Sequence, residues 1–466
     1  MALFSKCVIG THLFFPKEEI ENLEELRENL TFISRFDDMV RIQTYKESDS
    51  MFGVPINFFG FCGDIRSKLL SSNIVDKVVD LRTDGNIGIN IKLKSRLWDY
   101  QENLVNKIME KVRQGVTGFF VEAKPGSGKT VVGIALMCRL NRTALVVVPK
   151  IDLVHQWVER LVEHSSITKD EIATCYNGKL SSNFDTAKVT VGLVHTLRLD
   201  RFGETFRKRF GVVVYDEVDF SIPPSTFAPV ASMFYARYRI GMTATRVRSD
   251  GLHKVFDKHL GQFKIAAESS RTMKPHVVQI FYPESSGYVA ESIDFKYRRG
   301  QILSRIANNT NRNMLVAKYT YMAYESGRDV LVLSDRKDQL MELHSILTTI
   351  HNVPKKHIGY FVSSMKDRAL RKEELKRTLE KCKIILGTYG MGSRGTDVQR
   401  LSALILATPH SNMTQISGRI ERFLEGKQQP VIIDFVDTAY SDLVKSGQSR
   451  LNYYTKQKLH VDKVYI

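Results

Sequence analysis

The sequence predicts an α/β fold: two tandem parallel-sheet units that follow a small N-terminal unit. Continuous apolar runs, such as 144–148 and 212–215, alternate with helix-like segments. This pattern is expected of parallel strands that are buried on both faces. A second series of such runs starts at 330, after a polar stretch. The chain has 466 residues, enough for roughly two to four domains.

Four parts are predicted along the chain. An N-terminal accessory domain spans 1–88, and the first parallel-sheet domain spans 89–265. A connection follows at 266–300, because its composition is polar and rich in turn residues. The second parallel-sheet domain, with a basic C-terminal tail, spans 301–466.

The accessory domain shows local patterns but no catalytic constellation. The stretch 17–29 is helix-like, and 39–45 alternates in the manner of a strand. The segment 53–55 predicts a turn, and the polar segment 82–88 predicts a turn or linker. A nucleic-acid contact and a purely structural role both remain open for this part.

A glycine-rich segment at 121–130 follows the apolar run 118–120 and leads into a buried helix. A strand, a glycine turn and a helix opened by Gly-Lys-Thr form a phosphate-binding loop. Lys129 is expected to reach the β- and γ-phosphates of ATP, and the Thr130 hydroxyl to hold Mg²⁺. Ala123 replaces the usual first glycine. The loop backbone that would surround the phosphates belongs to Gly126, Ser127 and Gly128.

A glutamine lies shortly before this loop. The segment 97–101 begins a helix, and Gln101 is the last residue of this segment. A side-chain amide both donates and accepts hydrogen bonds, so Gln101 is a candidate for recognising the adenine edge.

Two adjacent carboxylates end the apolar run 212–215. Groups at the carboxyl ends of parallel strands line the ligand crevice, so Asp216 and Glu217 are expected beside Lys129. Asp216 is predicted to bind Mg²⁺, and Glu217 to orient and deprotonate the attacking water.

Two other strands of this domain end in polar residues. The run 189–194 leads into His195 and Thr196, and the run 239–245 contains Thr243 and Thr245. Such hydroxyls are candidates for sensing the acidic cluster and coupling nucleotide state to neighbouring segments. The predicted coupling residues are Asp219, Thr243 and Thr245.

The second domain has strand-like runs but no phosphate loop. Its predicted strands are 330–334, 384–388, 403–407 and 431–435, with a helix at 338–347. It carries the segments 393–397 and 415–422 instead.

The segment 415–422 suggests arginine fingers. On a helix, Gln415, Arg419 and Arg422 would share one face. Arginines placed in this way are predicted to stabilise charge on the γ-phosphate during hydrolysis.

The composition points to an anionic partner. The net charge is +17, which favours nucleic acid, although a basic surface with no such role is the alternative. The five cysteines are scattered, which indicates reduced thiols and argues against a structural zinc site. No membrane span or signal peptide is evident, so the predicted location is cytoplasmic, in the host cytoplasm if the source is viral.

Taken in order, these blocks resemble the superfamily 2 helicases and translocases, over about residues 95–435. In the first domain, 123–130 is similar to motif I, 149–150 lies where motif Ia is expected, 195–196 where Ib is expected, and 216–219 and 243–245 are similar to motifs II and III. In the second domain, 334–336, 387–397 and 415–422 are similar to motifs IV, V and VI.

A narrower resemblance lies in 241–251, which is similar to a signature of the XPB-like branch of this superfamily. That branch includes phage branch-migration helicases of the UvsW kind. The segments 97–101 and 311–313 also fit the branch, whereas Arg246 departs from its usual proline.

The resemblance implies two RecA-like domains that bind ATP and Mg²⁺ between them. It implies a DNA helicase or translocase acting as a monomer on forks and junctions in replication, recombination or repair. The alternatives are an RNA helicase or transcript-release ATPase of the same superfamily, and a non-enzymatic nucleic-acid-binding protein on a degenerate ATPase fold.

Further roles follow from the motif positions. Gly395 and Asp397 join the ATP-binding set. The predicted nucleic-acid contacts are Pro149, Lys150, His195, Thr196, Ser334, Arg336, Gly387 and Thr388. The basic tail, with Arg450, Tyr453, Tyr454 and Lys456, is either a stacking surface for bases or a docking helix.

Overall fold

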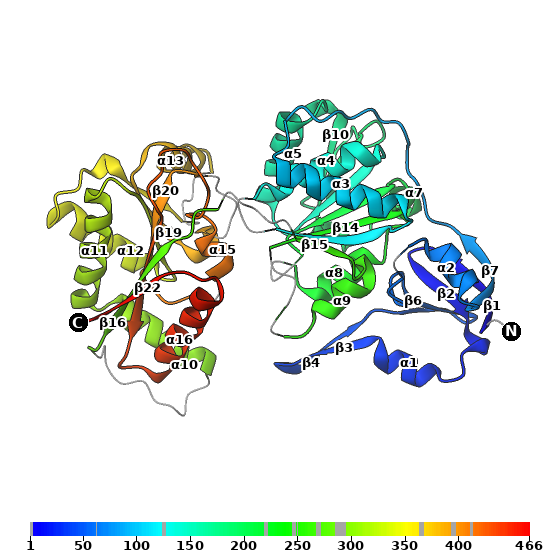
Figure 1. Cartoon of the computed structure of the whole chain (residues 1–466), viewed down its shortest axis with the longest axis horizontal. Coiled ribbons are helices and arrows are strands. Elements are labelled where there is room, and N and C mark those ends of the chain that lie inside the picture. Colours follow the sequence, from blue (N-terminus) through cyan, green and yellow to red (C-terminus); the bar gives the residue numbers. More distant parts are fainter. Residues whose placement is uncertain are drawn as a thin grey trace. The chain divides into compact units, whose positions relative to one another are not determined.

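The computed structural model divides the chain into two compact units, residues 1–270 and 271–466 (Figure 1). It describes all residues except 1–2, 62, 124–126, 219–221, 245–247, 249, 267–271, 285–294, 363–367, 393–397 and 411–412. Within helices, the side chains of 295–297, 368–372, 391–392 and 414–415 are also not described.

The accessory part of unit 1 is built on a five-stranded sheet in the order β5-β6-β2-β1-β7. Its strands are β1 (Phe4–Ile9), β2 (His12–Pro16), β5 (Lys46–Glu47), β6 (Met51–Pro55) and β7 (Val75–Asp80), and its helices are η1 (Lys17–Glu19), α1 (Leu23–Asn29) and α2 (Ile65–Ser71). The turn predicted at 53–55 is wrong, because Gly53 lies within β6. A Cβ at Gly53 would lie 2.5 Å from the Phe14 ring, so this glycine permits close packing between neighbouring strands.

A separate hairpin joins the accessory part to the parallel sheet. Strand β3 (Thr31–Ser34) pairs with β4 (Asp37–Gln43), which confirms the strand predicted near 39–45. Ile42 is buried in the core of the first parallel-sheet domain, and Phe32 packs against that core. The Arg35 N–H donates to the Asp250 carbonyl at 3.1 Å. The hairpin is thus rooted in the parallel-sheet domain.

The predicted linker at 82–88 is irregular, as expected, but it is fixed in place. Asp84 accepts a hydrogen bond from the Arg237 guanidinium at 2.6 Å and also pairs with Arg142. Isolated bridges join Thr83 to Ala236 and Ile87 to Arg142. Unit 1 therefore includes both the accessory part and the first parallel-sheet domain.

The first parallel sheet has eight strands in the order β11-β10-β12-β9-β13-β14-β8-β15. They are β8 (Gly118–Glu122), β9 (Ala144–Val148), β10 (Ile172–Tyr176), β11 (Lys179–Leu180), β12 (Val189–Leu193), β13 (Val212–Asp216), β14 (Tyr238–Thr243) and β15 (Lys264–Ala266). Only β11 runs antiparallel to its neighbour.

Helices cover both faces of this sheet, so alternate residues of each strand enter different cores. One core holds side chains of α3 (Asp99–Arg113), α4 (Lys129–Leu140) and α5 (Ile151–His164). The other holds side chains of α6 (Val194–Leu197), α7 (Gly203–Lys208), α8 (Pro224–Ala231) and α9 (His253–Leu260). The short helix η2 (Lys169–Glu171) precedes β10. Burial on both faces explains the continuous apolar runs.

The second parallel sheet has seven strands in the order β18-β19-β17-β20-β21-β16-β22. They are β16 (His276–Tyr282), β17 (Asp329–Ser334), β18 (Ile358–Phe361), β19 (Ile384–Thr388), β20 (Leu401–Leu406), β21 (Val431–Asp437) and β22 (Val461–Tyr465). Its helices are α10 (Phe295–Ala307), α11 (Thr310–Glu325), α12 (Lys337–Thr349), η3 (Lys355–His357), α13 (Arg368–Lys381), α14 (Tyr389–Gly392), α15 (Met413–Ser417) and α16 (Ser441–Lys456). The fold is thus two RecA-like parallel-sheet domains with an accessory region, as predicted.

In unit 2 one prediction needs correction, and the structure favours one of the two alternatives left open for the tail. The connection predicted at 266–300 contains β16, which pairs with both β21 and β22, so the sheet does not begin at 330. The basic tail is a docked helix rather than a stacking surface. In α16 the buried Arg450 guanidinium lies 2.8 Å from Asp434, and the Tyr454 hydroxyl lies 3.1 Å from the same carboxylate. Among the described residues, no helix is both long and apolar enough to cross a bilayer.

Basic side chains are buried where the accessory sheet meets the first parallel-sheet domain. The rings of His12 and His259 lie 5.8 Å apart, near Lys46 and Arg239. Burial, followed by the charge of Lys46, lowers the pKa of His12 to about 3. Burial also lowers the pKa of His259, and His12, Arg239 and Lys46 add to the shift. Both histidines are therefore neutral in the folded protein at neutral pH.

This arrangement predicts that unit 1 loses stability in acid. Below about pH 6.5 the unfolded chain binds protons at His12 and His259 that the folded chain excludes, which costs about 1.4 kcal/mol per pH unit for each histidine. For His12 the loss continues until the pH approaches about 3. Urea unfolding between pH 7.5 and 4.5, followed by the fluorescence of the two tryptophans, Trp98 and Trp157, measures it.

The variant His259→Leu should remove one histidine's contribution to the slope of unfolding free energy against pH. His195→Gln, which alters an exposed histidine, should keep the wild-type slope. An identical slope in His259→Leu and wild type would contradict the assignment.

Candidate functional site

At the described end of the loop between β8 and α4, the backbone leads directly into the helix, as the sequence predicts. Gly128 precedes α4 with φ of +76°, and Lys129 and Thr130 form the first turn of that helix. The positive φ favours glycine here, and a Cβ at Gly128 would lie 2.4 Å from the Gln101 side-chain nitrogen and displace that amide. The predicted residue Gly126 lies outside the described residues, whereas Ser127 is described and buried.

Gln101 supports this loop in the structure. Its Nε2 donates to the Ser127 carbonyl at 3.2 Å, and its Oε1 accepts from the Trp98 backbone N–H at 3.0 Å. The Tyr100 hydroxyl also donates to the Ser127 carbonyl. The predicted contact between Gln101 and adenine stays a prediction, and the observed role is to position the loop.

The structure brings the predicted catalytic residues of unit 1 together. In the sheet, β14 alone separates β13 from β8. The Lys129 Nζ lies 3.7 Å from the Glu217 Oε1. Glu217 has φ of +55°, a conformation that is uncommon for a residue other than glycine. Its backbone N–H donates to Asp216 Oδ1 at 2.9 Å. Strain of this kind is typical of functional positions.

The environment of Asp216 favours a bound cation. This carboxyl group is only 5% exposed. Burial first and the Glu217 charge second raise its pKa to about 6, whereas Lys129 and a hydrogen bond from Trp157 act in the opposite direction. Two carboxylates near one ammonium leave an excess of negative charge. The donor set therefore fits a Mg²⁺ ion that carries ATP, held through Asp216 and Thr130.

Trp157 fixes the Asp216 carboxylate through a hydrogen bond. It lies on α5, is 1% exposed, and its Nε1 donates to Asp216 Oδ2 at 2.7 Å. The sequence analysis did not identify Trp157 or Tyr100. The available signal was weak: Trp157 is one of two tryptophans in the chain, and it occupies the apolar stripe of a helix that follows the loop.

Strand β14 connects the two parts of the site. The Ala123 N–H donates to the Thr243 carbonyl at 3.0 Å, and the Val218 N–H donates to the Met242 carbonyl at 3.0 Å. Thr243 is fully buried. The end of β14 therefore contacts both the phosphate loop and the acidic turn. The coupling residues Asp219 and Thr245 lie outside the described residues.

The predicted nucleic-acid contacts of unit 1 differ in exposure. His195 is exposed and Lys150 is half-buried. Pro149 is buried, and so is Thr196, whose hydroxyl accepts from the Gly178 N–H at 3.5 Å. His195 and Lys150 are thus the accessible members of this set.

In unit 2, Ser334 is fully buried. Its hydroxyl donates to Gln339 at 2.6 Å and accepts from the Arg336 N–H at 2.9 Å, so it shapes the turn after β17. The Arg336 guanidinium binds the Gly300 carbonyl at 2.9 Å. This burial argues against a phosphate contact for Ser334. At the end of β19, Gly387 is buried and Thr388 is half-buried.

The prediction that Gln415, Arg419 and Arg422 share one helix face is wrong. Helix α15 ends at Ser417, Arg419 follows in a turn, and Arg422 forms an isolated bridge with Thr272. Arg419 is 6% exposed. The side chain of Gln415 and the residues Gly395 and Asp397 lie outside the described part of the chain.

Comparisons with known proteins show what the chain as a whole is similar to. Residues 94–248 match the family described as type III restriction enzyme, res subunit. A protein of Acanthamoeba polyphaga mimivirus named as ATP-dependent RNA helicase L396 is 27% identical over 430 residues, covering 91% of this chain and 78% of the relative.

Two solved structures also align with this chain. The ATP-dependent type ISP restriction-modification enzyme LlaBIII, bound to DNA, is 14% identical and aligns over 80% of this chain and 31% of its own, with a TM-score of 0.57. The crystal structure of T4 UvsW is 16% identical and aligns over 99% of both chains, with a TM-score of 0.39.

The two parallel sheets and the Lys129, Asp216 and Glu217 cluster define an ATPase of the two-domain RecA-like class. The family match and the viral relative support a superfamily 2 helicase assignment for this chain. The same similarities support nucleic-acid-dependent ATP hydrolysis as its activity.

The contact between Trp157 and Asp216 yields a prediction. Trp157→Phe should lower the kcat of ATP hydrolysis about tenfold, because a hydrogen bond to a charged group contributes about 1.5 kcal/mol. Steady-state ATPase assays measure the change. Glu159→Ala, on an exposed position of the same helix, is the matched control and should keep the wild-type rate. A fully active Trp157→Phe enzyme would rule out this role.

Proposed function

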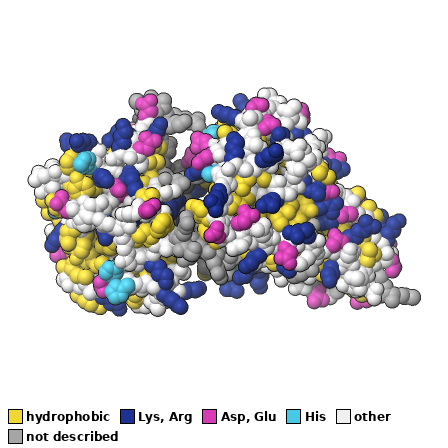
Figure 2. Space-filling view, turned by 45° about the horizontal axis from the view of Figure 1, so that its top comes forward, with side chains coloured by type: hydrophobic (Ala, Val, Ile, Leu, Met, Phe, Trp, Pro, Cys, Tyr) yellow, Lys and Arg dark blue, Asp and Glu magenta, His cyan; other side chains and the backbone are white. Residues whose placement is uncertain are grey.

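We propose that this helicase is a DNA translocase that remodels forks and junctions in replication, recombination or repair. The observation that carries the proposal is the assembled ATP site, with Lys129 3.7 Å from Glu217 and a buried Asp216 beside them. The net charge of +17 suits a polyanionic partner. Figure 2 shows Lys and Arg side chains spread over the face in view, with acidic side chains among them.

The chain's own residues account for the hydrolytic step. Lys129 and the backbone after Gly128 bind the phosphates, and Asp216 and Thr130 hold the metal. Bound Mg²⁺ would supply charge neutralisation for the phosphates. Glu217 then orients the attacking water and accepts its proton. Trp157 keeps the Asp216 carboxylate in a fixed orientation during this step.

Arg419 and Arg422 are proposed to complete the site from unit 2, together with Gln415. Positive charge at the γ-phosphate lowers the energy of the transition state. Gly395 and Asp397 are proposed as further ATP contacts. Hydrolysis would then depend on both units, and β14 would pass the change at the phosphate loop to the acidic turn through Thr243.

The nucleic acid is proposed to contact exposed polar residues at the strand ends, chiefly Lys150, His195 and Thr388. Contacts to phosphates carry little sequence information, so selectivity should be for structure. We propose that the enzyme acts as a monomer in the cytoplasm, that of the host if its source is viral. The DNA-bound LlaBIII structure and the resemblance to the XPB-like branch favour DNA.

A second candidate is an RNA helicase or transcript-release ATPase. The observation that favours it is the name of the mimivirus relative. A non-enzymatic role on a degenerate fold is disfavoured, because Lys129, Asp216 and Glu217 are present and placed together.

A substrate panel tests the proposal. We expect ATP hydrolysis to be stimulated, and strands to be separated, on forked DNA and four-way junctions more than on plain DNA duplex or RNA duplex. Lys129→Ala should abolish both activities, because it removes the positive charge that binds the phosphates. Gel-based unwinding and coupled ATPase assays measure these outcomes. Activity confined to RNA would establish the second candidate instead.

The arginines of unit 2 provide an independent test. Arg422→Ala should reduce ATP hydrolysis about 10³-fold, because an arginine finger contributes 10³–10⁵ to kcat. Binding of a fluorescent ATP analogue should change less than about threefold. Lys318→Ala, an exposed cation on α11, is the control and should hydrolyse ATP normally. If Arg422→Ala kept its activity, the finger assignment would be abandoned.

A further inference from the structure

Three potential metal ligands share one face at the edge of the second sheet. Strand β22 is the last strand of that sheet and runs parallel to β16, with Val277 opposite Val461 and Val278 opposite Asp462. His276 and His460 each lie one residue before the first of these pairs. Side chains two residues apart on a strand point to the same face, so His460 and Asp462 project together beside His276.

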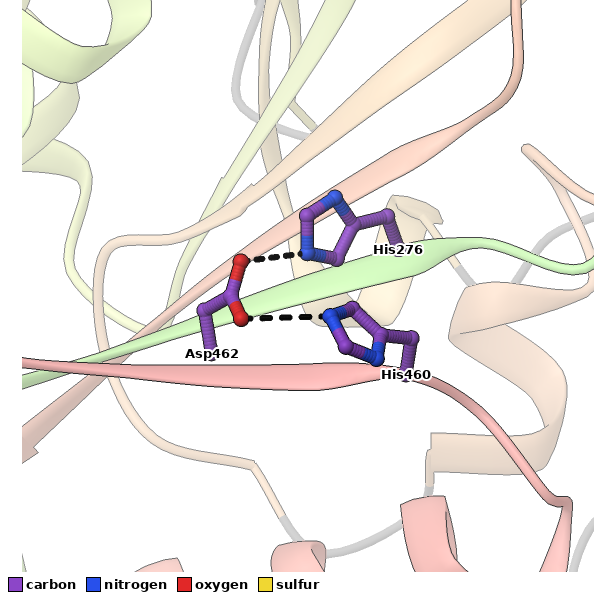
Figure 3. A group of neighbouring side chains, drawn as sticks. All are labelled: His276, His460 and Asp462. Atoms are coloured by element: carbon purple, nitrogen blue, oxygen red, sulfur yellow. Dashed lines mark hydrogen bonds and ion pairs between the residues drawn. The ribbon is translucent and has the colours of Figure 1, made fainter.

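The side chains converge in the structure (Figure 3). His276 Nε2 lies 2.8 Å from Asp462 Oδ2, and His460 Nε2 lies 3.2 Å from Asp462 Oδ1. The two imidazole rings have centroids 4.9 Å apart. The candidate ligand atoms all lie within 4.8 Å of one another. One carboxylate is thus flanked by two imidazole nitrogens that come from neighbouring strands.

We propose that His276, His460 and Asp462 form a binding site for a first-row divalent cation such as Zn²⁺. Imidazole nitrogens and a carboxylate oxygen are ligands that zinc accepts, at about 2.0–2.2 Å. Tetrahedral coordination at this radius separates the ligand atoms by about 3.3 Å. Small rotations of partly exposed side chains reach this spacing from the observed one. The fourth position stays open to water.

The ligand set differs from that of the ATP site. Mg²⁺ prefers oxygen ligands, whereas two imidazoles favour zinc, cobalt or nickel. Within the described part of the chain, this is the one group of three such side chains whose ligand atoms converge. Its residues belong entirely to unit 2, and none of them takes part in the proposed hydrolysis.

Binding would cross-link β22 to the interior of the sheet. Edge strands are held on one side only, so a metal between β16 and β22 would restrain the terminal strand. On its other side β16 pairs with β21, and its buried Gln279 donates to Asp434, the partner of Arg450. The ion would therefore secure β22 to a rigid part of unit 2. The exposure of His460 and Asp462, at 74% and 53% of their side chains, makes the binding reversible.

Calorimetric titration of the chelator-treated, ATP-free full chain with ZnCl₂ tests the site. We expect one ion to bind with a Kd in the low micromolar range, and His276→Gln and His460→Gln each to weaken it at least tenfold. His155→Ala, an exposed histidine of unit 1, is the matched control and should bind as wild type does. If the acidic residues of the ATP site bound the zinc instead, binding would persist in both glutamine variants, and this result would contradict the proposal.

Hydrogen exchange supplies a second measurement. Zinc should slow exchange of the amides in 461–465 several-fold in wild type and leave them unchanged in His460→Gln. Melting temperatures without zinc should agree between wild type and the glutamine variants, which shows that folding is intact. Zinc affinity weaker than about 100 μM, or affinity unchanged in His460→Gln, would overturn the proposal.

Discussion

Burial of Asp216 between the half-buried Glu217 and one lysine is the constraint on which unit 1 depends. A buried carboxylate is costly unless hydrogen bonds and opposite charge compensate it. Asp216 receives hydrogen bonds from Trp157 and from the Glu217 backbone, and Lys129 lies near the pair. The raised pKa of Asp216, about 6, shows that this compensation is incomplete. The remaining negative charge suits the divalent metal that the proposed function requires.

Unit 1 also contains a buried basic group, Arg239, whose charge is compensated by backbone carbonyls. Arg239 is fully enclosed, and its guanidinium donates to the backbone carbonyls of Ala231, Phe234 and Thr11. Thr11 lies between β1 and β2 of the accessory part, and the other two residues belong to the first parallel-sheet domain. A cation satisfied by carbonyls of both parts fixes one against the other. This explains why the accessory part and the first parallel sheet form a single compact unit, although the sequence changes character near residue 88.

The sequence predicted the features that periodicity and local chemistry determine. Strands β9 and β13 were evident because burial on both faces makes them continuously apolar. The acidic pair was placed beside Lys129 because parallel strands end at one edge. Strand β16 was missed because its buried residues include the polar Gln279. The Gln279 amide donates hydrogen bonds to Asp434 and to the Gly447 carbonyl, which are distant in sequence. Trp157 was missed for the same reason, since its partner Asp216 is 59 positions away.

The arginines of unit 2 show where periodicity fails. Seven residues of ideal helix would align Gln415 with Arg422, but the chain leaves the helix after Ser417. Met413, Ile416 and Ile420 enter the core, and the Lys427 ammonium binds the Arg422 carbonyl at 2.7 Å. Tertiary packing therefore sets the backbone that carries Arg419 and Arg422. Because that backbone is not a regular helix, the directions of the two arginine side chains follow from core packing and from the Lys427 contact, and a helical repeat read from the sequence does not give them.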